Sequence, residues 1–146
     1  SHKPKISFYE GWEGAKVIYE DGLSSLNTGE ELLNYTGFTD YFNYMPREYA
    51  EDYIYRRLQK RIHIRIITPQ SSSAEEFQKR ATKELRRIKI VPAEKGNFSA
   101  DLHIYKNKVG IISFKDNFMS VLIESKEIAD MFKMAFELMW KGADYP

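Results

Sequence analysis

Hydrophobic residues recur along the chain with two different periods, and the switches between them predict an order of strands and helices. Alternating apolar residues and β-branched runs are typical of strands, whereas apolar residues three or four positions apart are typical of amphipathic helices. These patterns predict strands at 5–9, 31–35, 62–68, 88–91, 101–105, 109–114 and 119–124, and helices at 12–26, 46–61, about 74–86 and 126–141. The aromatic residues 38–44 fit neither period. Strands separated by helices, then a meander and a closing helix, predict an α/β sandwich with a mixed sheet flanked by helices.

The closing helix is apolar around most of its circumference. Its charged residues fall on one narrow stripe that consists of Lys126, Asp130, Lys133, Glu137 and Lys141. A helix of this kind usually covers a sheet on one side and meets another element or a second subunit on the other. We therefore expect a homodimer. The expected interface residues are Met131, Met134, Leu138 and Trp140.

Composition narrows the classes of function. With 146 residues, 42% of them hydrophobic, the chain is long enough to fold as a single domain. A net charge of +1 offers no general attraction to nucleic-acid phosphates. The basic residues Arg56, Arg57, Lys60 and Arg61 follow acidic residues on the same expected helix, so we expect them to form a solvated, ion-paired face.

Cysteine usage and hydropathy limit the compartment and the partners. The chain contains no cysteine, which excludes disulfides, thiolate metal sites and cysteine nucleophiles and fits a reducing cytoplasm. No apolar run reaches the ~20 residues needed to span a bilayer, so we expect no membrane partner. Residues 1–2, Ser-His, are typical of a tag remnant, and we interpret residues 3–146 as one domain of a longer protein.

Several segments carry a recognisable family pattern. They are PKISFYEG at 4–11, GAKVIYEDGL at 14–23, and the strands and closing helix of residues 100–143. Together they resemble the effector domain of the TrmB family of transcriptional regulators. That family joins a winged-helix DNA-binding domain to a phospholipase-D-like sensor domain, which binds an effector, often a sugar, and dimerises.

The resemblance implies a function for residues 3–146. We expect a phospholipase-D-like fold that binds an effector and dimerises, with DNA contacted only through an N-terminal winged helix that this segment does not include. Sugar-sensing members of the family carry a further C-terminal region that holds much of the sugar site, and this segment stops before it. The expected effector is therefore a sugar or another metabolite.

Phospholipase-D chemistry requires His-x-Lys and then, after four more residues, Asp. The histidine attacks phosphorus while the lysine stabilises the phosphoryl oxygens. Here His103 is followed by Tyr105 at the lysine position and Gly110 at the aspartate position, so we expect no enzymatic activity. Two alternatives stay open. One is a phosphodiesterase or nuclease that acts as a dimer with one motif per chain, and the other is an interaction module without a small ligand.

Candidate ligand-binding residues lie mainly where strands end before turns, because ligands of α/β sheets tend to sit outside the carboxyl ends of strands. The candidates are Tyr9, Glu10, Gly11, Tyr35, Thr36 and Thr68, and Asp101 joins them because the TrmB-like pattern implies an acidic residue there. Asp101, His103 and Tyr105 share one face of a strand, but two ligand-type side chains are too few for a metal site. No metal or other cofactor is expected.

Overall fold

The alternating segments form the strands of one seven-stranded sheet in the computed structural model, which describes residues 3–143. The strands are β1 (Lys5–Tyr9), β2 (Glu31–Thr36), β3 (His63–Pro69), β4 (Arg86–Val91), β5 (Asp101–Tyr105), β6 (Lys108–Ser113) and β7 (Met119–Glu124). The α-helices are α1 (Gly11–Ser25), α2 (Phe38–Tyr44), α3 (Arg47–Gln59), α4 (Ser72–Lys79) and α5 (Lys126–Gly142). Two short 3₁₀ helices, η1 (Thr82–Glu84) and η2 (Ala93–Lys95), complete the described elements.

The sheet is mixed, with strand order β1-β7-β6-β5-β2-β3-β4. Strands β2, β3 and β4 pair in parallel, which requires the helical crossovers α2–α3 and α4 between them. The other pairs are antiparallel, and β5, β6 and β7 form the expected meander. The register aligns Tyr9 with Ser120, and Asp101 with both Ile112 and Thr36. The carboxyl ends of β1, β2 and β3 therefore point to the same side of the sheet, the row of strand ends that is called the sheet edge below.

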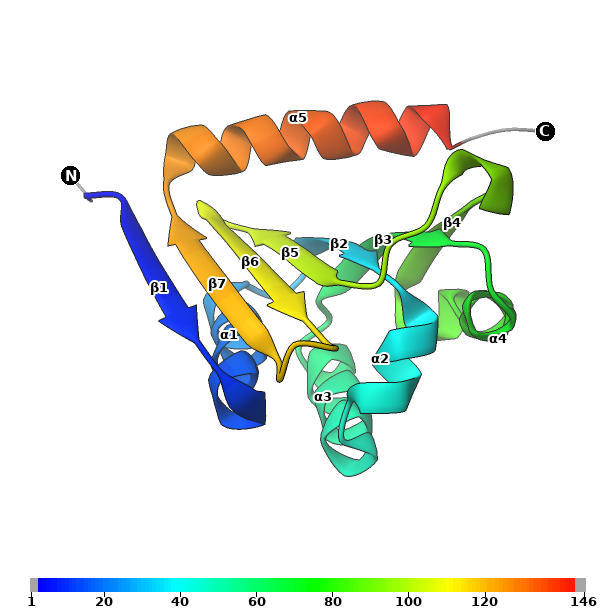
Figure 1. Cartoon of the computed structure of the whole chain (residues 1–146), viewed down its shortest axis with the longest axis horizontal. Coiled ribbons are helices and arrows are strands. Elements are labelled where there is room, and N and C mark those ends of the chain that lie inside the picture. Colours follow the sequence, from blue (N-terminus) through cyan, green and yellow to red (C-terminus); the bar gives the residue numbers. More distant parts are fainter. Residues whose placement is uncertain (1–2, 144–146) are drawn as a thin grey trace.

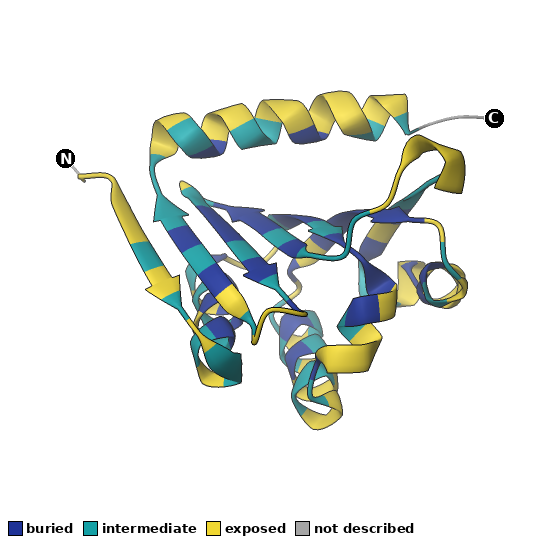
Figure 2. Cartoon of the chain, in the orientation of Figure 1, coloured by how far each residue is buried: buried dark blue, intermediate teal, exposed yellow. Residues whose placement is uncertain are grey.

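Helices cover both faces of the sheet (Figure 1). Helices α1, α2, α3 and α4 lie on one face, where Ile18 and Phe77 belong to the larger core cluster. Helix α5 lies alone on the other face, over a smaller cluster that contains Ile67 and Phe136. Figure 2 shows buried residues along the central strands and exposed residues along the outer side of α5. No helix within residues 3–143 is long and apolar enough to cross a membrane.

The predicted order of strands and helices is confirmed, and the differences are local. The aromatic residues 38–44 form α2, because Phe38 stacks on Phe77 of α4 at a centroid distance of 4.5 Å. Helix α4 starts earlier than predicted, since the Ser71 hydroxyl accepts the amide hydrogen of Ala74 as its N-cap. It also ends earlier, and Leu85, with φ of 55°, turns the chain into β4.

Candidate functional site

A polar groove of about 500 Å³ lies at the sheet edge where β2 and β3 end. It is lined by Gly37 and Pro69, directly after two of the three strand ends that the sequence singled out, and by the loop that contains Asn97 and Phe98. Gly37 has no room for a side chain, since a Cβ there would lie 2.6 Å from the Phe98 carbonyl oxygen. The closeness of the two loops shapes this part of the groove.

The predicted ligand-binding residues share the sheet edge but do not share one site. Tyr9, Glu10 and Gly11 end the edge strand β1, four strand spacings from β2, or roughly 20 Å. The Gly11 amide donates to the Asn117 carbonyl oxygen at 2.7 Å, so this turn packs against the β6–β7 turn. Tyr35 points to the opposite face, toward α5, where its ring lies 5.3 Å from that of Phe136.

The remaining predicted residues are buried beneath the groove. Thr68 is 0% exposed, and its hydroxyl donates to the Pro69 carbonyl oxygen. Thr36 and Asp101 are each 2% exposed and belong to a polar cluster on the helix-rich face of the sheet. The sequence thus predicted the correct end of the sheet for a groove. The predicted ligand-binding residues themselves, however, are divided between the surroundings of that groove, an internal polar cluster and the distant strand β1.

The internal cluster is built around the Asp101 carboxylate. It accepts hydrogen bonds from the Tyr19 hydroxyl at 2.5 Å and from the Asn34 amide at 2.6 Å, and His103 Nε2 lies 3.2 Å away. Burial by itself raises the pKa of Asp101, but the charge of His103 and hydrogen bonds from His103, Tyr19 and Asn34 outweigh burial and hold the pKa below its ordinary value. Asp101 is thus a buried carboxylate in its charged form.

Sequence analysis missed most partners of Asp101. Neither Tyr19 nor Asn34 has a role in the sequence-based prediction, although a buried position for Asn34 next to Leu32 and Leu33 in strand 31–35 is a signal for an internal hydrogen bond. Within residues 3–143 no group of three His, Asp or Glu side chains could hold a metal ion.

A small cavity of about 40 Å³ adjoins the cluster, and residues of the central strands and of α2, α3 and α4 line it. Two buried atoms in its lining residues, His103 Nδ1 and Thr36 Oγ1, have no hydrogen-bond partner in the described part of the chain. The cavity is also lined by Arg57 and Arg86, which are 1% and 6% exposed. The solvated face predicted for the basic residues of α3 is therefore wrong for Arg57, because its guanidinium turns inward and donates to the carbonyl oxygens of Ile62 and Glu84.

The outer side of α5 is a row of exposed apolar residues. Met131, Met134 and Leu138 are 63%, 61% and 66% exposed. Trp140 differs, since it is partly buried on its own fold and stacks on Phe136 at 5.8 Å. The helix therefore covers the sheet with one side, as the sequence predicts, and leaves its other side free of contacts with the rest of the described chain.

Comparisons with known proteins identify a similar fold. No protein-family model matches the chain, and no curated protein matches it. The solved structure of TrmBL2, an archaeal chromatin protein described as showing a novel mode of DNA binding, superposes with a TM-score of 0.63 at 14% sequence identity. The match covers 94% of this chain and 53% of TrmBL2, so the chain spans about half the length of that protein.

The fold is TrmB-like. The superposition confirms the predicted class, α/β with a mixed sheet flanked by helices and closed by an apolar helix. At 14% identity it shows the fold alone. The relation to phospholipase D stays a prediction.

Proposed function

We propose that this chain is the effector-sensing and dimerisation domain of a TrmB-like transcriptional regulator and has no catalytic role. The support is the fold shared with about half of TrmBL2, a DNA-binding protein, together with the TrmB-like segments of the sequence. The observation that carries the proposal is the free outer side of α5, because a row of exposed apolar residues on a helix is typical of an interface.

The exposed row of α5 is complementary to itself. Glu127, Met131, Met134, Leu138 and Lys141 follow one another at intervals of four, three, four and three residues, so they form one stripe. If two copies pack antiparallel about a twofold axis at Met134, Met131 faces Leu138 of the second copy and Glu127 faces its Lys141. Neither Glu127 nor Lys141 forms an ion pair with another residue of 3–143. Both charges are thus available at the ends of an apolar seam.

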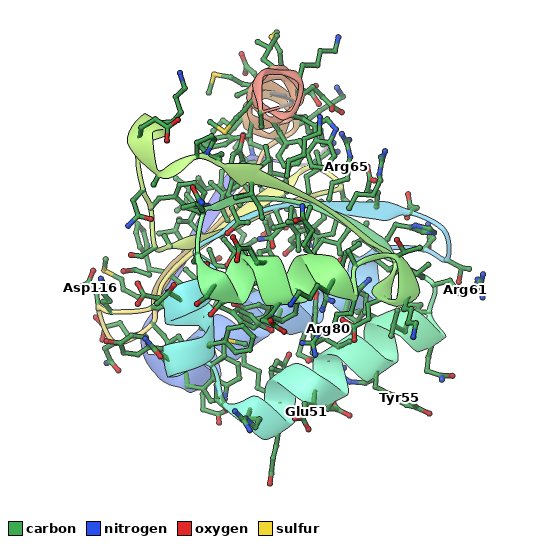
Figure 3. The ribbon with its side chains drawn as sticks, turned by 90° about the vertical axis from the view of Figure 1, so that its right-hand side faces the viewer. Glu51, Tyr55, Arg61, Arg65, Arg80 and Asp116 are labelled. Atoms are coloured by element: carbon green, nitrogen blue, oxygen red, sulfur yellow. The ribbon has the colours of Figure 1, made fainter. Side chains whose placement is uncertain are left out.

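Disulfide trapping tests this arrangement directly, since the chain has no cysteine of its own. Met134→Cys places a thiol on the proposed twofold axis and should give a covalent dimer under mild oxidation. Glu51→Cys, on the exposed side of α3 (Figure 3), is the matched control and should stay monomeric. A light-scattering mass of one chain for the unmodified protein at high micromolar concentration, with no dimer from Met134→Cys, would contradict dimerisation.

Charge exchange tests the direction of the helices. Glu127→Lys and Lys141→Glu should each weaken the dimer, and the double variant should restore it, because each interface contains the pair twice. Exposed ion pairs contribute about 0.2–1 kcal/mol each, so the loss of two pairs should raise the dissociation constant by about 2- to 30-fold. Equal weakening by the double variant would argue against the antiparallel direction without removing the dimer.

The sheet-edge groove is the proposed effector site. Its lining combines the hydrogen-bonding side chains of Asp40, Gln70 and Asn97 with the rings of Phe38 and Phe98, a mixture that suits a polyhydroxylated metabolite. A second pocket of about 410 Å³ lies between Asn97, Phe98 and the end of α5. The Phe98 ring also lies 6.2 Å from that of Tyr35, which in turn contacts Phe136 of α5.

Loop 96–99 therefore borders both the groove and the closing helix. In the proposed mechanism an effector that orders this loop shifts the equilibrium between two arrangements of the α5 dimer, which requires different affinities for the two arrangements. This gives Tyr35 a coupling role between groove and helix in place of direct ligand contact.

Thermal melts against sugars, polyols and other metabolites test the effector site. A ligand at 100 times its dissociation constant adds about 2.7 kcal/mol, which raises the midpoint by several degrees. Asn97→Ala should reduce the shift, whereas Asn43→Ala, on the exposed side of α2, should leave it intact. A flat panel would favour the alternative of an interaction module without a small ligand.

The proposed lack of catalysis rests on the setting of His103. Its side chain is buried, with Nε2 beside Asp101, so a phosphodiester cannot reach it without rearrangement of the helical layer. We expect no hydrolysis of model phosphodiesters. Turnover that His103→Ala abolishes would favour the nuclease alternative.

A further inference from the structure

The cavity beside Asp101 has a mixed lining, in which charged and hydrogen-bonding side chains lie next to apolar residues such as Leu32 and Ile64. Its volume of about 40 Å³ has room for a few water molecules or one small ion. It lies under α2, α3 and α4, apart from the sheet-edge groove, with which it shares the lining residue Phe38. Neither the effector groove nor the α5 interface involves its charged side chains.

Arg57 brings a positive charge to this cavity, and the nearby charge of Glu84 raises its pKa by less than burial lowers it. Its guanidinium donates to two backbone carbonyl oxygens, of Ile62 at 2.8 Å and Glu84 at 2.6 Å. No ion pair joins it to a carboxylate among the described residues 3–143. The Glu84 carboxylate pairs instead with Arg86 and with Arg80. A buried guanidinium without a counterion is costly, so the fold favours an anion nearby.

Asp101 is the carboxylate of the cavity itself, but donors already surround it. Tyr19, Asn34 and His103 occupy its two oxygens. The pKa of Arg57 is lowered to about 10, first by burial and then by the charge of Arg86. The guanidinium groups of Arg57 and Arg86 are charged at neutral pH. Neither of them donates a hydrogen bond to Asp101 among the contacts of residues 3–143.

Three further polar groups of the lining are hydrogen-bond donors: the phenols of Tyr41 and Tyr53 and the hydroxyl of Thr36. Burial and the charge of Asp101 raise the pKa of Tyr41 to about 12, and burial also raises the pKa of Tyr53, so both phenols keep their protons. The buried hydroxyl of Thr36 has no partner. Guanidinium, phenol and hydroxyl donors together suit an anion better than a cation or an apolar group.

An outer pocket adjoins this cavity. It measures about 270 Å³, lies between α2, α3 and α4, and shares Tyr41, Ile54 and Phe77 with the inner cavity. Arg80 also lines it and lies between α4 and α3 in Figure 3. The guanidinium groups of Arg80 and Arg86 lie over the Phe77 ring, at 4.5 and 4.6 Å from its centroid. Positive charge therefore continues from the surface to the interior.

We propose that the inner cavity is a binding site for one small anion, held by Arg57 and Arg86 and by the hydroxyl of Thr36. The chemistry is that of a compact anionic group, either a free inorganic anion or the carboxylate of a small metabolite that enters through the outer pocket. The site is independent of the proposed regulator role, because the charges and the cavity are properties of the isolated domain.

Bromide is a direct probe, because its anomalous scattering identifies it in a crystal. Crystals soaked in sodium bromide should show a peak within hydrogen-bond distance of Arg57 or Arg86. In solution, replacing sodium gluconate by sodium bromide at constant ionic strength should raise the melting midpoint, since gluconate is too large for the cavity. A cavity that holds only water at high bromide, or bromide peaks at surface arginines alone, would overturn the proposal.

Variants and competitors sharpen the result. Arg86→Gln should abolish the bromide-dependent shift, whereas Arg61→Gln, at the end of the molecule labelled in Figure 3, should retain it. Should Arg86→Gln fail to fold, the bromide peak in the unmodified protein still decides. Displacement of bromide by formate, acetate and pyruvate would identify a metabolite carboxylate, and displacement by nitrate or phosphate alone would identify an inorganic anion.

Discussion

The two faces of the sheet treat a buried arginine in opposite ways. Arg65, on the α5 face, binds both oxygens of Glu137 at 2.7 and 2.8 Å and Glu31 at 2.9 Å, and its guanidinium lies 5.2 Å from the ring centroids of Phe136 and Trp140. The hydrogen bonds that Arg65 donates to Glu137 raise the pKa of Arg65, whereas burial lowers the pKa of Arg57 on the other face. Figure 3 shows Arg65 on the side of the sheet that α5 covers.

This difference indicates that the α5 face of the sheet is a packing surface, whereas the helix-rich face contains a candidate binding site. The buried Arg65 under α5 has two carboxylate partners, so this face serves to hold the closing helix. Within residues 3–143, the helix-rich face leaves the Arg57 guanidinium without an ion pair and two buried atoms without hydrogen bonds, beside a cavity. Unsatisfied buried groups are rare in native proteins and favour a missing partner. The predictions below test whether the two faces differ in this way.

The largest effect is expected where α5 meets the sheet. Phe136 is 0% exposed and is the central ring between Tyr35 and Trp140. Phe136→Ala removes that ring and leaves a cavity, so we expect a loss of about 3–5 kcal/mol in the free energy of unfolding, measured by urea denaturation.

The neighbouring Met134→Ala is the control for that change. Met134 is 61% exposed, so the monomer should lose less than about 0.5 kcal/mol. Similar losses for the two variants would mean that α5 is not held by its buried side.

A smaller but pH-dependent loss is expected on the helix-rich face. Asp101→Asn weakens the hydrogen bonds from Tyr19, Asn34 and His103 and should cost about 1.5–3 kcal/mol at neutral pH. Because the pKa of Asp101 is lower in the folded than in the unfolded chain, its stabilisation is present above the ordinary value of 3.8 and is lost as the pH falls below it.

Denaturant midpoints from pH 7 to pH 2 check the sign of this dependence. The unmodified protein should lose stability on acidification, and Asp101→Asn should lose less over the same interval. Parallel curves for the two proteins would show that Asp101 has the same pKa in the folded and unfolded chain.

An intermediate effect is expected at Gly110, which packs against α1. A Cβ at this position would lie 2.5 Å from the Ile18 Cγ2 methyl group. Gly110→Ala should therefore destabilise the protein by about 1–3 kcal/mol, because the packed core must shift. Gly110→Ala with Ile18→Leu removes the clashing methyl and should recover part of the loss in the same thermal melts. If Gly110→Ala is as stable as the unmodified protein, α1 can shift away from β6 at little cost.

Local patterns explain how much of this could be predicted from the sequence. The period of apolar residues located the seven strands and every α-helix except α2, and the ends of β2 and β3 located the groove at Gly37 and Pro69. The same rule failed for Tyr9, because β1 reaches its place by pairing with β7, more than 100 residues later in the chain. No local pattern contains that pairing.

The polar cluster could not be predicted for the same reason. Tyr19 and Asn34 lie 82 and 67 residues from Asp101, and only the assembled sheet brings them together. Charge spacing on α3 correctly predicted the pair Arg56–Asp52 but gave no sign that the next residue, Arg57, turns inward. Helical periodicity predicts which side chains share a face of α3. Which of those faces is buried depends on how α3 packs beside β3 and η1, and the helix sequence does not contain that information.

The smallest effect is expected from the arginine that has its partners. Arg65→Met keeps an apolar stem under α5 but removes the ion pairs, and Glu137, with a side chain 51% exposed, regains water. We therefore expect a loss of about 1 kcal/mol or less in the free energy of unfolding, reduced further at high salt. Arg57→Met should cost less stability than the two lost hydrogen bonds alone suggest. The reason is that the substitution also removes a buried charge that has no ion pair, which offsets part of the loss. If thermal melts show that bromide stabilises the Arg65→Met protein but not the Arg57→Met protein, the anion belongs to the helix-rich face, whereas equal responses would remove the distinction between the two arginines.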